Sequence, residues 1–196
     1  MPDVNVVGDV VLTDPRVMRE LAHPLRLALH DHLRRRGPAT IGELASLVSS
    51  RSSAIRDHLE ALEAVGLVEC QQHDADPEES RWSAVGRGFV FEIPEDPAGQ
   101  AAARQLSNAM LLHYVDLPRQ WVAEVEPQLE LEWARPAGLL NTRVVVTPNE
   151  LRDLQVALER LLEPFLTRAG ATPKAARHVR VLSYFMPEDA GGGADR

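Results

Sequence analysis

The sequence of 196 residues has a single cysteine, Cys70, so it can form neither an intramolecular disulfide nor a metal cage of several cysteines. It contains no run of 18 apolar residues, which excludes an ordinary membrane-spanning helix. Its first residues lack the basic and then apolar profile of a secretion signal. These absences predict a soluble cytoplasmic protein that makes no contact with a membrane.

The sequence also lacks the motifs of catalysis. It has no phosphate-binding loop, no nucleophile elbow and no pair of carboxylates at a convincing catalytic spacing. The histidines are dispersed, and His30 and His32, two residues apart, point to different faces of a helix. Cys70 lies in a core-like stretch, where a buried, unreactive thiol is expected. The sequence therefore predicts no enzyme activity, no metal and no cofactor.

The charge is acidic overall but uneven along the chain. The formal net charge is −8, which disfavours a nucleic-acid ligand because phosphate contacts need cations. Residues 23–60, however, carry six arginines against four acidic residues. DNA contacts one face of a protein, so the global sum does not exclude DNA binding. A hydrophobic content of 44% is enough to build a core.

Helix start and stop signals are clear in the first half. Asp14-Pro15 predicts a helix over 16–22, and Pro24 opens a second helix that ends in three arginines and Gly37. Thr40 and Glu43 have the spacing of a capping box for a short third helix. The serine-rich stretch 49–53 is the turn into a fourth helix, which reaches about Val65. The third and fourth helices with their short turn predict a helix-turn-helix.

Two strand-like stretches, 67–73 and 81–85, follow directly and enclose the polar stretch 74–80. A hairpin in this position is a wing. A further extended piece is expected over 89–93, and the first dozen residues are irregular or form a short strand over 6–12. The best domain boundary follows, at Glu95-Asp96-Pro97.

The second half predicts a helix over 97–125, broken near Pro118, and a helix from 147 or 149 with leucines on one seam. Strands are expected at 129–133, 143–147 and 179–186, and 189–196 reads as a disordered tail. The fold class is α+β and mainly α, with a winged helix-turn-helix domain, a helical dimerisation segment and a small α+β C-terminal domain. The expected domains are 1–94 for DNA binding, 95–188 for dimerisation and an effector, and the tail.

Three consecutive blocks, 21–27, 40–45 and 57–68, resemble ArsR-type winged helix-turn-helix regulators over about residues 14–92. The resemblance implies a homodimer on a pseudo-palindromic site, with the recognition helix in the major groove and repression released by a ligand. The metal sensors of this family carry a cysteine pair on a DNA-binding helix. The matching helix, 40–48, has none, so metal sensing is not carried over, and the longer second half does not match these members.

If Ile55, Leu59 and Leu62 face the core, then the start of the fourth helix faces outward. Exposed amides at a helix start favour phosphate, and Arg56 can donate two hydrogen bonds to guanine. The candidate DNA-contacting residues are Thr40, Ser50, Arg51, Ser52, Ser53, Arg56 and Arg81. The alternatives are that the serines and Thr40 only cap helices, that Arg56 pairs with Glu60, and that the acidic wing tip is repelled by DNA.

Most of the aromatic residues lie in the second half. They form a candidate effector pocket of Tyr114, Trp121, Trp133, Phe165 and Tyr184. The alternative is a plain core and dimer interface, for which the apolar stripes 106–121 and 151–165 are both candidates. Taken together, the sequence predicts a homodimeric, sequence-specific repressor of transcription that an unknown non-metal ligand releases from double-stranded DNA. The alternative is a winged-helix module that binds protein instead of DNA.

Overall fold

Four helices with sequence-encoded ends build the first half of the chain. The computed structural model describes residues 4–5, 8–48, 51–73, 76–166 and 172–188. The four helices are α1 (Pro15–Leu21), α2 (Pro24–Arg36), α3 (Ile41–Val48) and α4 (Ser52–Glu63). The Asp14 carboxylate accepts a hydrogen bond from the Arg16 amide at 2.8 Å, and Gly37 ends α2 with a φ of 87°. The predicted ends of α1 and α2 are thus confirmed.

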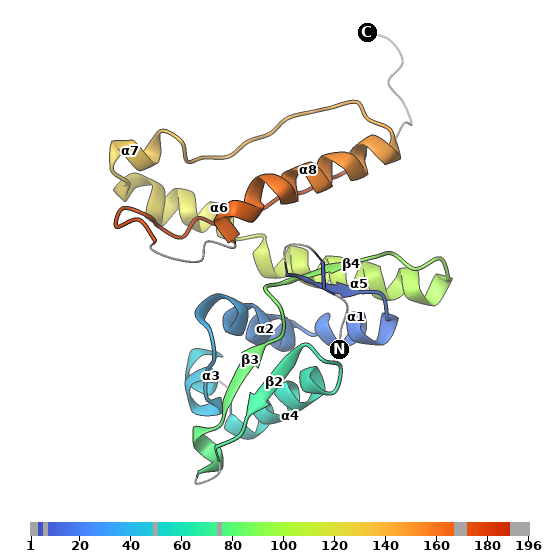
Figure 1. Ribbon diagram of the computed structural model, residues 1–196, viewed down its shortest axis with the longest axis vertical. Helices are drawn as coiled ribbons and strands as arrows, with labels where there is room; N and C mark the ends of the chain where they lie inside the picture. Colours follow the sequence, from blue (N-terminus) through green and yellow to red (C-terminus); the bar gives the residue numbers. More distant parts are fainter. Residues whose placement is uncertain (1–3, 6–7, 49–50, 74–75, 167–171, 189–196) are drawn as a thin grey trace.

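These helices pack around one hydrophobic core in the lower part of the molecule (Figure 1). Ile55, Leu59 and Leu62 of α4 are fully buried, as their spacing predicts. Leu29 and Leu33 of α2 belong to the same buried cluster. Burial of one such side chain stabilises the fold by about 1.5–3 kcal/mol, so α4 is held firmly by its inner face while its outer face stays in solvent.

The predicted wing is present. Strand β2 (Val68–Gln71) pairs antiparallel with β3 (Arg81–Ala84), with Val68 opposite Ala84, and the 3₁₀ turn η1 (Pro77–Glu79) lies in their connection. The backbone of Trp82 also exchanges hydrogen bonds of 2.8 and 2.9 Å with Ala39, which joins the hairpin to the loop before α3. These backbone hydrogen bonds attach the wing to the helix-turn-helix at the loop before α3.

A second, two-stranded sheet closes the core. Strand β1 (Val10–Leu12) lies parallel to β4 (Phe89–Phe91), with Val10 opposite Phe89. The sequence predicted both pieces as extended but not their pairing. Val10 and Leu12 are buried, so residues from near both ends of this half cover the same side of the core.

Helix α5 (Pro97–Tyr114) begins at Asp96, whose carboxylate accepts a hydrogen bond from the Gly99 amide at 2.8 Å. Its first half packs on α1, and Ala102, Ala103 and Leu106 are buried there.

The helix predicted over 97–125 stops at Tyr114, earlier than expected. It is followed by α6 (Leu117–Gln120), the π-helical turn η2 (Trp121–Val125) and the 3₁₀ turn η3 (Glu126–Gln128). Pro118 lies in the first turn of α6, where its missing N–H costs nothing, so the break comes before it.

The remaining elements are α7 (Leu131–Ala134) and α8 (Pro148–Leu166). The strand predicted over 129–133 is wrong, because 131–134 is helical. The strands predicted over 143–147 and 179–186 are also wrong, since neither stretch belongs to a ladder in the part of the chain that the structure describes. Both stretches are rich in apolar residues, but neither pairs with another strand within the described residues. The predicted tail, 189–196, lies outside the described residues.

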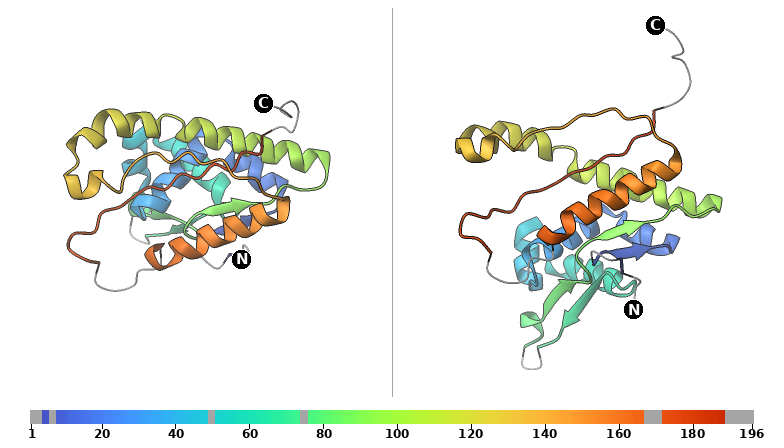
Figure 2. Two further views of the ribbon diagram at one scale, coloured as in Figure 1. Left: turned by 90° about the horizontal axis from the view of Figure 1, so that it is seen from above. Right: turned by 45° about the horizontal axis from the view of Figure 1, so that its top comes forward.

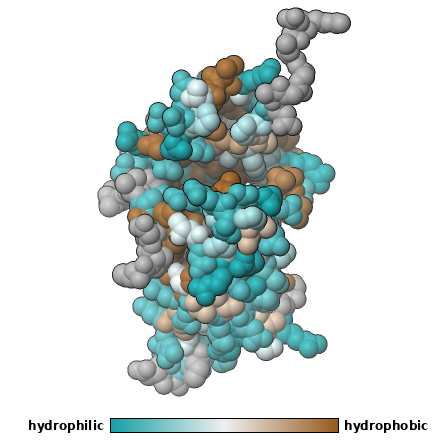
Figure 3. Space-filling model, turned by 90° about the vertical axis from the view of Figure 1, so that its right-hand side faces the viewer, coloured by the Kyte–Doolittle hydropathy of each residue, from teal (hydrophilic) through white to brown (hydrophobic). Residues whose placement is uncertain are grey.

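The two halves differ sharply in burial. After Leu106, none of the described residues, 107–166 and 172–188, is buried. Leu140 is 91% exposed, Val145 is 100% exposed and Leu161 is 67% exposed. Apolar side chains gather on the upper part of the face in Figure 3, above a largely hydrophilic lower part. The second half thus exposes an apolar surface to solvent, which soluble proteins rarely do.

The fold is therefore mainly helical α+β, with a winged helix-turn-helix followed by a long helix and further helices, and all described strands lie in the first half. Figure 1 places α8 above α5, away from the wing, and in the view from above in Figure 2 the C-terminal segment runs between α5 and α8. Within the described residues, no helix is both long and apolar enough to cross a bilayer.

Candidate nucleic-acid interface

The start of α4 is open to solvent. Arg51 occupies the N-cap position with extended backbone and makes no capping hydrogen bond with its side chain. Ser52 and Ser53, the first two helical residues, are exposed. The serine side chains thus leave the first amide groups of α4 available, and such groups bind anions such as phosphate. Ser50, also predicted in this surface, lies outside the described residues.

Arg56 stands one turn further along α4, with its side chain 40% exposed. Its guanidinium donates to the Glu78 carboxylate of η1 across 3.3 Å. The partner is therefore on the wing, 22 residues away, and not Glu60 on the same helix. Both side chains are largely solvated, so the pair contributes at most about 1 kcal/mol, and a phosphate or a base edge can compete for the guanidinium.

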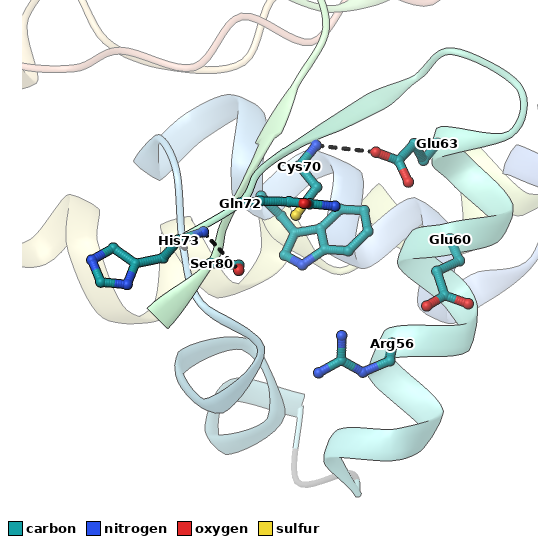
Figure 4. Close-up of a pocket in the computed structure, with 8 residues that line it drawn as sticks. Arg56, Glu60, Glu63, Cys70, Gln72, His73 and Ser80 are labelled. Atoms are coloured by element: carbon teal, nitrogen blue, oxygen red, sulfur yellow. Dashed lines mark hydrogen bonds between the residues drawn. The ribbon is translucent and has the colours of Figure 1, made fainter. Parts of the chain in front are cut away.

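A cavity of about 320 Å³ separates α4 from the wing (Figure 4). Arg56, Glu60 and Glu63 line it from α4, and the hairpin side contributes Cys70, Gln72, His73, Ser80 and Trp82. The Cys70 amide donates to Glu63 across 3.2 Å, and the His73 amide donates to the Ser80 hydroxyl across 3.2 Å. Burial and the nearby Glu63 raise the pKa of the Cys70 thiol, so this cysteine is poorly reactive.

Thr40 and Arg81 are both engaged within the protein. The Thr40 amide donates to Glu43 at 2.8 Å, and the Glu43 amide donates to the Thr40 hydroxyl at 3.2 Å, which confirms the capping box. The Arg81 guanidinium donates to the Pro38 carbonyl at 2.7 Å and approaches Glu43 at 3.5 Å. Arg81 therefore fixes the base of the wing against the start of α3, and its remaining N–H groups stay in solvent.

The five aromatic residues of the candidate effector pocket belong to five different parts of the second half: α5, η2, α7, α8 and the C-terminal segment. Trp133 lines a second cavity of about 280 Å³ with Glu132, Pro136 and Ala175, and the Arg177 guanidinium lies 5.1 Å from its ring centroid. The remaining four, Tyr114, Trp121, Phe165 and Tyr184, line neither cavity. Phe165 is 65% exposed and Tyr184 is 49% exposed. The effector pocket that the sequence predicts from these five side chains stays a prediction.

A polar cluster that the sequence did not predict surrounds Asp31 on α2. Its members, here called the Asp31 cluster, are Asp31, Arg34, Arg35, His113, Tyr114 and Arg180. Burial alone would raise the pKa of Asp31, but the neighbouring His113 and the hydrogen bond from Arg34 outweigh it and hold that pKa well below its usual range. Burial and the neighbouring carboxylate raise the pKa of Tyr114 to about 12. The run of arginines at 34–36 was the only sequence signal of this cluster.

The described histidines form no metal site. His23 and His58 stack with ring centroids 4.6 Å apart, and the described residues contain no group of three or more histidine, cysteine or acidic side chains able to hold a metal ion. His23 is instead structural, because its Nδ1 accepts a hydrogen bond from the Leu25 amide at the start of α2.

Comparison with known proteins supports the helix-turn-helix. The family model described as a helix-turn-helix domain matches residues 21–71, which run from the end of α1 to the end of β2. No protein in a collection of curated sequences matches the chain.

Three solved structures are distantly similar to this chain. A MarR family regulator from Neisseria meningitidis, NMB1585, is 15% identical, with 73% of this chain and 80% of that chain covered and a TM-score of 0.34. The transcriptional regulator Tm0710 from Thermotoga maritima is 13% identical, with 78% and 87% covered and a TM-score of 0.30. A probable transcriptional regulator from Pseudomonas aeruginosa is 19% identical, with 74% and 88% covered and a TM-score of 0.31. Such distant likenesses carry nothing about this chain's ligands, so its function rests on its own geometry.

Proposed function

We propose that the chain is a sequence-specific, double-stranded-DNA-binding regulator of transcription. The helix-turn-helix and its wing form one continuous surface, with α4 as the recognition helix. Ser52 and Ser53 let its start approach the phosphates, and Arg56 reaches the base edges in the major groove. We place this activity in residues 1–94.

The observation that carries the proposal is the contrast between the two faces of α4. Its inner face is fully buried through Ile55, Leu59 and Leu62, while Ser52 and Ser53 are exposed and Arg56 is held only by a solvated ion pair. A helix that packs this tightly on one side and leaves its starting amides open on the other is built to present its N-terminal turn to an anionic ligand.

The binding test uses a DNA library from which bound duplexes are selected and then titrated by fluorescence anisotropy. Arg56→Ala is expected to weaken the selected duplex by about 5- to 150-fold, because a bidentate contact with guanine contributes roughly 1–3 kcal/mol. The matched control is Arg119→Ala, which removes the same charge from an 84% exposed side chain of α6. If both variants bind like the unchanged protein, or if no duplex is bound in a salt-sensitive way, the proposal fails.

We also propose an ArsR-type arrangement, in which two copies bind two half-sites. Two-fold winged-helix dimers place their recognition helices about 34 Å apart, so half-sites about 10 base pairs apart, or a multiple, are expected. The open apolar surface after Leu106 supports a second copy as its partner, with the α8 seam available for contact. Repression that a non-metal ligand releases is the regulatory mode we propose, through a shift in the DNA-competent population.

The alternative function is a winged-helix module that binds protein. The ion pair between Arg56 and Glu78 favours it, because an acidic wing that occupies the recognition arginine hinders phosphate contacts. A partner complex that survives Arg56→Ala, with no DNA retained by the unchanged protein, would favour this alternative over the regulator.

A further inference from the structure

The Asp31 cluster joins three distant parts of the chain. Asp31, Arg34 and Arg35 belong to the end of α2, His113 and Tyr114 to the end of α5, and Arg180 to the C-terminal segment. The end of α5 lies between the winged-helix half and the upper half of the molecule (Figure 1). The cluster is thus the place where helix α2 of the winged-helix half meets the C-terminal segment.

The two oxygens of the Asp31 carboxylate are used differently. Oδ1 accepts a short hydrogen bond from Arg34 at 2.6 Å and another from the Tyr114 hydroxyl at 3.2 Å. Around Oδ2 stand Arg35 at 3.5 Å, His113 Nε2 at 3.6 Å and Arg180 at 3.9 Å. Charge-assisted hydrogen bonds are normally about 2.7–2.9 Å long. Oδ1 is therefore well satisfied, while three donors converge near Oδ2 and none of them makes a short contact.

Positive charge is in excess at this place. Three guanidinium groups share the single carboxylate of Asp31, which is only 7% exposed. Asp9 also lies near Arg34, but Arg87 acts on the same carboxylate. Burial, and the proximity of Arg35, lower the pKa of the Arg180 guanidinium, which is 28% exposed. Arg35 and Arg180 make only long contacts with this shared carboxylate, and their side chains stay 46% and 28% exposed. Both are thus incompletely neutralised and open to a second anion from solvent.

We propose that the Asp31 cluster binds a small dianion, with phosphate or carboxylate oxygens bridging Arg35 and Arg180 beside His113. The planar guanidinium forks match such oxygens in pairs. This proposal rests on the proposed function in one respect, because it names this dianion as the effector that acts between the C-terminal segment and α2. Arg34 stays with Asp31 and holds the α2 side of the site in place.

The test titrates the full chain, without DNA, with inorganic phosphate and separately with malonate, by calorimetry and by thermal unfolding. Sodium chloride at matched ionic strength measures the non-specific effect of salt. Saturable binding with one site per chain is expected. Arg180→Ala should weaken this binding about tenfold or more, because a hydrogen bond between charged groups contributes at least about a factor of ten in affinity. Binding of only one of the two anions shows which oxygen chemistry the site takes.

Two matched variants separate this site from general charge effects. Arg177→Ala removes an arginine of the same segment that stacks on Trp133 and pairs with Glu130 instead. Arg36→Ala removes the neighbour of Arg35 at the end of α2. Both should bind phosphate like the unchanged protein. Circular dichroism and the midpoint of thermal unfolding without anion check that Arg180→Ala is folded, and Arg180→Lys, which keeps the charge without the fork, should bind with intermediate affinity.

The proposal is overturned if neither anion binds beyond the chloride effect, or if Arg177→Ala and Arg180→Ala lose the same affinity. It is equally overturned if Arg180→Ala weakens DNA binding while neither free anion binds, because the arginines would then serve the DNA backbone. Saturable anion binding by a chain that retains no DNA contradicts the regulator function and leaves the anion site standing.

Discussion

At the scale of single residues, the proposed DNA contact of Arg56 can be tested through its ion-pair partner on the wing. Glu78→Gln removes the carboxylate that pairs with Arg56 at 3.3 Å. An exposed pair contributes at most about 1 kcal/mol, so DNA affinity should rise by up to about fivefold. The measurement is a fluorescence anisotropy titration at fixed salt. Glu79→Gln, in the same turn, removes an equal charge without touching the pair, and an identical gain in both variants would show that the pair is irrelevant.

A buried histidine sets the acid limit of stability. His30 is 1% exposed, its ring packs edge-on against Phe89, and neither ring nitrogen has a hydrogen-bond partner among the described residues. Burial lowers its pKa to about 4, so the unfolded chain binds a proton below about pH 6.5 that the folded chain rejects. The free energy of unfolding should therefore fall by about 2 kcal/mol between pH 7 and pH 5.

Urea unfolding at a series of pH values measures this effect. His30→Leu should remove most of the decrease between pH 7 and pH 5, while His73→Gln, at an exposed position, should keep it. An unchanged pH dependence in His30→Leu would assign the acid sensitivity to other groups.

At the scale of elements, two glycines at helix starts have opposite roles. A Cβ on Gly42 of α3 would meet nothing closer than the Thr40 hydroxyl at 3.9 Å, whereas a Cβ on Gly99 of α5 would lie 2.4 Å from Pro94. Gly42→Ala should stabilise the protein by about 0.5–1 kcal/mol, because it lowers the entropy of the unfolded chain. Gly99→Ala should destabilise it by about 1–3 kcal/mol through overpacking. The two changes in urea midpoint, measured side by side, should have opposite signs, and equal signs would contradict the packing described at α5.

The sequence predicted those helices whose ends are determined by capping residues close to them in the chain. Asp14, Thr40 and Gly37 act on backbone groups within a few residues, so α1, α2 and α3 were readable without tertiary contacts. The alternation over 129–133 failed as a strand signal because a strand exists only with a neighbour, and here 131–134 is helical.

The candidate site shows the same division between local and distant contacts. The exposed start of α4 followed from the spacing of its buried residues. The partner of Arg56 did not, since Glu78 is 22 residues away, and Tyr114 contacts Asp31 across 83 residues. Such pairs depend on how the chain returns on itself, which the periodicity of a single sequence does not encode.

At the scale of the whole molecule, the open seam of α8 predicts association. Leu161→Glu places a charge where the side chain is 67% exposed in one chain but would be covered in the proposed dimer. The unchanged protein should have the mass of two chains in light scattering after size-exclusion chromatography, and Leu161→Glu should shift it toward one, because an unpaired buried charge is strongly unfavourable. Gln155→Glu, an exposed polar position of α8, should stay dimeric. A monomeric unchanged protein at tens of micromolar would exclude this use of the seam.

The parallel pairing of β1 with β4 has a consequence for synthesis. Val10 and Leu12 leave the ribosome early, yet their partner strand, Phe89–Phe91, follows about eighty residues later. Until β4 is made, one side of the hydrophobic core of these helices stays uncovered, so the helices remain only partly folded. Contacts between residues far apart in the sequence also slow folding. The core of the winged helix-turn-helix is thus completed by residues that are translated well after its helices, and translation products that end before β4 would lack a stable core.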